Sequence, residues 1–145
     1  LVRLIRSTIM DARLANIFNL ENIDILDYRI AANTLEIAGD TVVELSQSLI
    51  KSNLSKVELK KLHDFAKDME EIQIKSIDSF ISNNRTLAID AISLQRNNAT
   101  KISKIRSSLE SKKQISLAFF DLIYMFEKVL QSWSDIADLV KPSYK

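Results

Sequence analysis

The sequence predicts an all-α protein, an antiparallel bundle of long helices, and three observations lead to this class. One glycine and one proline in 145 residues are too few for the turns of β-rich or nucleotide-binding folds. Apolar residues recur at helical spacing along most of the chain. A content of 46% hydrophobic and 27% charged residues is typical of a folded chain. At this length we expect one domain, residues 1–145, with a sizeable core.

Residue types that are rare or missing exclude several function classes. Without cysteine there is no disulfide, thiolate metal site or cysteine nucleophile, and a single histidine removes most zinc and general-base sites. A net charge of +1 supplies no strong field that attracts nucleic acid. The sequence has no run of about 18 apolar residues, so no membrane span is expected, and residues 1–6 do not resemble a signal peptide. We therefore expect a cytoplasmic protein that is not an enzyme. The chain opens without Met inside a helical pattern, so we expect a fragment of a longer protein.

The first predicted helix runs from about residue 2 to 18, with Ile5 and Ile9 on its apolar face, and ends at a turn near Asn19. The second runs from about 24 to 52, with Asp24 or Asp27 as its N-cap. Its apolar residues alternate by four and three positions, which is the spacing of packed antiparallel bundles: Ala31, Leu35, Ala38, Val42, Leu45 and Leu49.

Ser55 and Glu58 have the spacing of a capping box and predict a third helix from about 56 to 82. Its inward residues are Leu62, Phe65, Met69, Ile72 and Phe80. Asn83 and Asn84 predict a break, because asparagine tolerates turn geometry and caps helices.

The fourth predicted helix reaches about residue 111, and Gln95 and Asn98 interrupt its apolar face. The fifth runs from about 114 to 140 and is stopped by Pro142. It has the most regular apolar face of the chain: Phe119, Leu122, Phe126, Val129, Trp133, Ile136 and Val140. At this spacing the aromatic residues are expected in the core.

A polar stripe on the second predicted helix contains Arg29, Asn33, Glu36 and Asp40. Glu36 and Asp40 stand at i and i+4, so the two carboxylates repel each other unless a positive charge lies between them. A divalent cation would suit their oxygens. The alternative, favoured by spacing alone, is a solvated outer face. His63 lies in a charged segment and is expected on the surface.

The C-terminal part of the fourth predicted helix is basic and includes Lys101, Lys104 and Arg106. The helix dipole favours cations at this end, which explains part of the pattern without a ligand. The alternative is a site for an acidic partner or a membrane surface. We name these three residues as the candidate partner-binding site.

Residues 28–40, which read Tyr-Arg-Ile-Ala-Ala-Asn-Thr-Leu-Glu-Ile-Ala-Gly-Asp, resemble the signature helix of the PhoU-like family of phosphate-uptake regulators. Glu36 and Asp40 match the acidic pair of that signature and Gly39 its small residue, whereas Ile37 replaces an arginine. The last predicted helix resembles a second, decayed signature. It keeps Glu127 but has Gln131 where an aspartate is usual.

The resemblance implies a PhoU-like helical domain that regulates phosphate uptake or phosphate signalling without catalysis, by contact with a transporter or sensor and as a homodimer. It implies a metal site, with zinc, iron or magnesium on Glu36, Asp40 and Glu127. Three carboxylates would give at most a weak site that suits magnesium, calcium or adventitious zinc better than an iron cluster. In archaea such a domain can follow an AbrB-like DNA-binding domain, so DNA would be a partner only through a missing upstream domain. The alternative function is a helical dimerisation or scaffold domain of a transcriptional regulator with no direct phosphate role.

Overall fold

The structure is a computed structural model that describes residues 2–110 and 116–140, and this part of the chain forms six helices and no strand. They are α1 (Val2–Met10), α2 (Ala12–Ile17), α3 (Asn22–Lys51), α4 (Lys56–Ser82), α5 (Arg85–Glu110) and α6 (Leu117–Asp138). The predicted all-α class and the packing of long helices are confirmed. The predicted stop at Pro142 lies outside the described residues.

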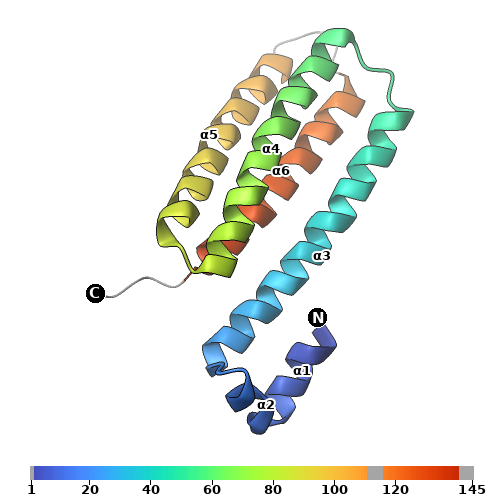
Figure 1. The fold of residues 1–145 in the computed structure, drawn as a ribbon. Helices are drawn as coiled ribbons and strands as arrows, with labels where there is room; N and C mark the ends of the chain where they lie inside the picture. The colour runs from blue at the N-terminus through green and yellow to red at the C-terminus, as the bar shows by residue number, and fades with distance from the viewer. Residues whose placement is uncertain (1, 111–115, 141–145) are drawn as a thin grey trace.

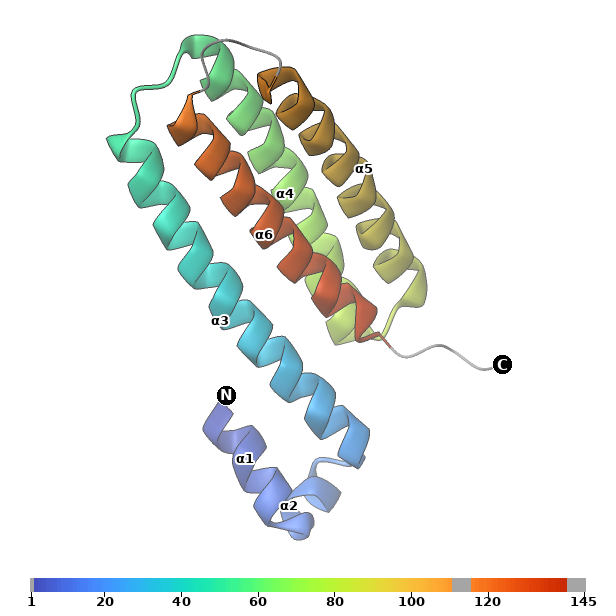
Figure 2. The ribbon, with the colours of Figure 1, turned by 180° about the vertical axis from the view of Figure 1, so that it is seen from behind.

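Helix α6 is the centre of the main bundle (Figures 1 and 2). It packs against α3, α4 and α5, and α4 also packs against α5. The backbone of α3 approaches α6 but neither α4 nor α5. The three helices α4, α5 and α6 therefore form a compact unit, and α3 lies along one side of it.

Helices α1 and α2 form a second packing unit with the first half of α3, and α1 and α2 themselves lie away from the main bundle (Figure 1). The same half of α3 also contacts α4, since the rings of Tyr28 and Phe80 meet edge to face with their centres 5.5 Å apart. Helix α1 contacts α2 and α3, and no other helix in the described part of the chain packs against it. The buried apolar residues of this unit are few, two isoleucines and two alanines: Ile5, Ala15, Ile25 and Ala32. The core of this unit, called here the α1–α3 unit, is therefore much smaller than that of the main bundle.

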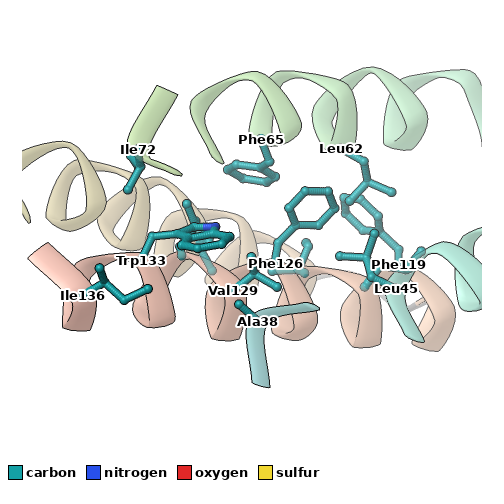
Figure 3. Packing of buried hydrophobic residues seen from close by; sticks show 14 residues of the cluster. Ala38, Leu45, Leu62, Phe65, Ile72, Phe119, Phe126, Val129, Trp133 and Ile136 are labelled. Atoms are coloured by element: carbon teal, nitrogen blue, oxygen red, sulfur yellow. The ribbon is translucent and has the colours of Figure 1, made fainter. Parts of the chain in front are cut away.

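The large core lies between α6 and its three neighbours (Figure 3). Phe119, Phe126 and Trp133 project from α6 toward α4, and each is at most 5% exposed. All seven residues predicted on the apolar face of the last helix are buried. The aromatic spacing of α6 is thus confirmed as core packing.

The ends of α4 form as the sequence predicts. The Ser55 backbone N–H donates to the Glu58 carboxylate at 2.8 Å, and the Glu58 N–H donates to the Ser55 hydroxyl at 3.3 Å, which completes the capping box. Asn83 adopts the left-handed conformation with φ of 50°, and the Asn84 side chain accepts hydrogen bonds from the first turn of α5. The predicted break at these asparagines is confirmed.

The N-terminal region differs from the prediction. The expected helix over 2–18 is interrupted at Asp11, whose carboxylate accepts a hydrogen bond from the Arg13 N–H at 2.9 Å and starts α2. Ile9, expected on the buried face, is 53% exposed. Helix α3 begins after Glu21, with Asp24 in the third helical position, where its carboxylate accepts from the Glu21 N–H at 2.8 Å. Neither Asp24 nor Asp27 is therefore the N-cap.

Gly39 is an exposed residue in the middle of α3. Apart from the adjacent residues and backbone of its own helix, no atom of the described residues lies within 4 Å of a Cβ placed at this position. Packing therefore does not require a glycine here, and the lack of a side chain weakens the helix locally.

Candidate functional site

The acidic pair predicted from the sequence lies on the surface of α3. Glu36 and Asp40 are both exposed, as are Arg29 and Asn33. The structure places this stripe in solvent, which agrees with the solvated-face interpretation. The carboxylates remain accessible to an ion or to another protein.

Glu127 lies on a different side of the bundle, between α5 and α6. Its carboxylate accepts a hydrogen bond from the Arg106 guanidinium, which lies 5.6 Å from the centre of the Phe120 ring. Both side chains of the ion pair are about a third exposed or less. The pair holds Glu127 toward α5, and the structure does not bring it to Glu36 and Asp40. In residues 2–110 and 116–140 no group of three or more aspartate, glutamate or histidine side chains could hold a metal ion.

The candidate partner-binding residues have separate roles. The Lys101 ammonium is 2.8 Å from the Asp68 carboxylate and links α5 to α4. Arg106 links α5 to α6 through Glu127. Lys104 is exposed, and the described part of the chain offers it no ion pair within 4 Å. Two of the three basic residues therefore link neighbouring helices, and binding of an acidic partner by Lys104 stays a prediction.

Gln95 and Asn98, which interrupt the apolar face of α5, are both buried, and Gln95 contacts α6. The Gln95 side-chain amide donates to the Gln131 carbonyl at 3.1 Å, and Gln131 donates to the Asp135 carboxylate at 2.7 Å. Asn98 is 2% exposed and donates to the Leu94 carbonyl, but its own side-chain oxygen has no hydrogen-bond partner among the described residues. Gln131, the residue that breaks the second signature in the resemblance, thus pairs two helices.

An open groove of about 490 Å³ lies between the C-terminal half of α3 and the N-terminal half of α6. Its charged lining residues are Glu44 and Lys51 from α3 and Asp121 and Lys128 from α6. Acidic and basic side chains alternate here, so the groove has no net sign that would select one charged ligand. It offers surface contact rather than an enclosed reaction chamber.

Exposed apolar side chains collect in the first 40 residues, and the sequence analysis did not identify this feature. The exposed fractions are 81% for Met10, 73% for Ile17 and 52% for Phe18. Residues 23–37 of α3 add further apolar side chains, each at least 40% exposed: Ile23, Leu26, Tyr28, Ile30 and Ile37. The signal in the sequence is that apolar residues of 22–40 occupy more sides of the helix than two neighbours can cover.

Comparison with known proteins adds no relative: no family model, no curated protein and no solved structure matches this chain. None of the helices in the described residues has an apolar stretch long enough to cross a bilayer.

Proposed function

We propose that this chain acts through contact with other proteins, and that these contacts regulate phosphate uptake or phosphate signalling. The exposed apolar side chains of α1, α2 and the first half of α3 support the contact function, because exposed patches of this kind are typical of interaction sites. The resemblance of residues 28–40 to the PhoU-like signature supports the phosphate role. Glu36 and Asp40 are exposed on that segment and accessible to a transporter or sensor protein.

The second candidate function is a dimerisation or scaffold domain without a direct phosphate role. The small core of the α1–α3 unit favours it, because a helical hairpin with few buried residues gains stability when a further helix covers it. Both functions use protein contact, and they differ in whether phosphate changes the outcome.

A test in the source organism separates the two. Deleting the gene should alter phosphate uptake and the transcription of phosphate-responsive genes, and the intact gene should restore both. A Glu36→Lys/Asp40→Lys gene should fail to restore them. The matched control is Asp64→Lys/Glu70→Lys on α4, which changes the same number of exposed carboxylates at another surface. If deletion leaves uptake and transcription unchanged at low and high phosphate, the phosphate role is wrong.

The metal that the resemblance implies stays a prediction, and elemental analysis of protein purified without chelator tests it. Stoichiometric zinc, iron or magnesium that is lost in the Glu36→Gln/Asp40→Asn variant would assign the metal to this pair. Metal that persists in the double variant would place the site on other residues.

A further inference from the structure

We propose that one exposed face of α3 binds the same face of a second copy of this chain, with the two helices antiparallel across a two-fold axis. The face, called here the outer face of α3, consists of Ile23, Leu26, Ile30 and Ile37. The inference rests on the proposed function only in that the chain acts by protein contact.

The outer face is an apolar surface that the described structure leaves uncovered. Its four residues are 48%, 50%, 40% and 41% exposed in chain order. Two other sides of α3 are occupied, because Ile25 and Ala32 pack in the core of the α1–α3 unit and Ala38 packs in the main core. At about 100° per residue, the outer face points roughly 90–130° away from both of these sides. A helix that is apolar on three sides is normally enclosed, so a third neighbour is expected.

The spacing of the outer face is that of a helix pair. Ile23, Leu26, Ile30 and Ile37 follow one another at intervals of three, four and seven residues, and Asn33 occupies the remaining position of the heptad pattern. In an antiparallel pair centred between residues 31 and 32, Leu26 of one copy faces Ile37 of the other. Ile23 faces the exposed Asp40 of the other copy at each end of the pair. Ile30 then faces Asn33 of the other copy, which places both Asn33 amides near the axis. A polar residue within such a face lowers affinity but selects one register.

Charges at the edge of the outer face fit the same arrangement. Arg29 and Glu36 are both exposed, and the described residues give neither an ion pair within 4 Å. They stand seven residues apart, about 10.5 Å along the axis, which is too far for a direct contact within one helix. In the antiparallel register, Arg29 of each copy lies on the same edge as Glu36 of the other, offset by two residues or about 3 Å along the axis, which their long side chains can span. A parallel pair would place threonines opposite them instead, so the charges favour the antiparallel dimer.

The two-fold symmetry gives a sharp charge-reversal test. Sedimentation equilibrium of the full chain should show a concentration-dependent dimer with twice the 16.5 kDa mass of the monomer. Arg29→Glu and Glu36→Arg should each weaken the dimer by at least about tenfold, because each creates two like-charge pairs. The double reversal should restore the affinity to within about threefold, because both ion pairs re-form with opposite polarity. Asp64→Arg, an exposed reversal on α4, should leave the dimer unchanged.

A second arm tests the apolar contact independently of charge. Ile30→Ser should weaken the dimer by at least about tenfold, whereas Ile74→Ser on α4 should not, although Ile74 is 54% exposed. Unchanged circular dichroism and unfolding midpoints confirm that each variant is folded.

Three results would overturn the proposal. A chain that stays monomeric at every concentration would show that no second copy binds. Failure of the double reversal to restore binding would show that the antiparallel register is wrong. Binding of the monomer to lipid vesicles through Ile30 would assign the face to a membrane. A monomeric chain that still regulates phosphate uptake refutes the dimer alone. A dimer that obeys the charge reversals in a cell with no phosphate phenotype refutes the phosphate role alone.

Discussion

Replacing Trp133 by alanine removes the only tryptophan of the chain from the middle of the main core. The side chain is 5% exposed and lies near Ile72 and Val129 (Figure 3). A buried aromatic side chain removes roughly 150–250 Å² from water, which at about 25 cal/mol per Å² corresponds to about 4–6 kcal/mol. The remaining methyl group keeps about 0.8 kcal/mol of this. We therefore expect Trp133→Ala to lower the free energy of unfolding by about 3–5 kcal/mol.

Trp133→Phe provides the matched control for this substitution. The indole N–H has no hydrogen-bond partner in the part of the chain that the structure describes, so removing it leaves no acceptor there unsatisfied. Phenylalanine keeps one ring in the core, and the cost should fall to about 1–2 kcal/mol. The difference between the two variants isolates the volume of the ring system.

Urea unfolding followed by circular dichroism measures both values, since the variants lack the tryptophan needed for fluorescence. The slope of the unfolding free energy with urea should stay constant, because the surface exposed on unfolding hardly changes. A loss below about 1 kcal/mol in Trp133→Ala would refute the reasoning, because it would show that Trp133 does not support the core. Equal losses in both variants would show that the indole N–H, and not the ring volume, matters.

Three further outcomes follow from other contacts. Hydrogen bonds from Ser55 lower the pKa of Glu58 from 4.5, so the stability that this carboxylate supplies is present above pH 4.5 and lost as the pH falls through the lowered pKa. Glu58→Gln should flatten the acid limb of a stability–pH curve. Arg106→Met should cost about 1–2 kcal/mol because Glu127 loses its partner in a partly screened site, whereas Lys104→Met, measured in the same urea assay, should stay within about 0.5 kcal/mol. Gly39→Ala should raise the thermal midpoint and stabilise the chain by about 0.5–1 kcal/mol, and a lower midpoint would show a hidden steric demand.

The main bundle could be predicted closely because α4 and α6 each bury one continuous face. The bounds of α4 match the prediction, and its first turn carries its own signal in Ser55 and Glu58. The last helix begins at Leu117 rather than near 114, but every residue predicted on its apolar face is buried. Local capping and one regular face were sufficient here.

The α1–α3 unit was harder to predict because α3 packs against different helices on different sides. Asp11 ends one helix and starts another through a side-chain hydrogen bond. The spacing of apolar residues in the sequence does not reveal such a bond. Leu35, predicted inward, is 37% exposed, since α3 has apolar residues on more than one side. No single period separates such faces.

The candidate site depended on pairings between distant segments, which the sequence could not show. Arg106 and Glu127 are separated by 21 positions and Lys101 and Asp68 by 33, so neither pair follows from spacing on one helix. On its own helix each basic residue belongs to a basic segment, and only the family resemblance implies Glu127 as a metal ligand. The structure converts them into cross-links between helices.

Helix α3 is one uninterrupted rod of 30 residues, about 45 Å long, that belongs to both packing units. Its first half packs against α1 and, through Tyr28, against Phe80 of α4, and its second half lies on α6 (Figure 2). A stiff rod held in this way acts as a lever, so a partner that tilts the hairpin end would move the opposite end across the groove beside α6. Gly39 lies between the two packed halves, and its freer backbone makes the helix easier to bend there. The exchange Gly39→Ala would therefore stiffen the lever as well as the helix, and mechanical transmission between the two ends of the protein would change with it.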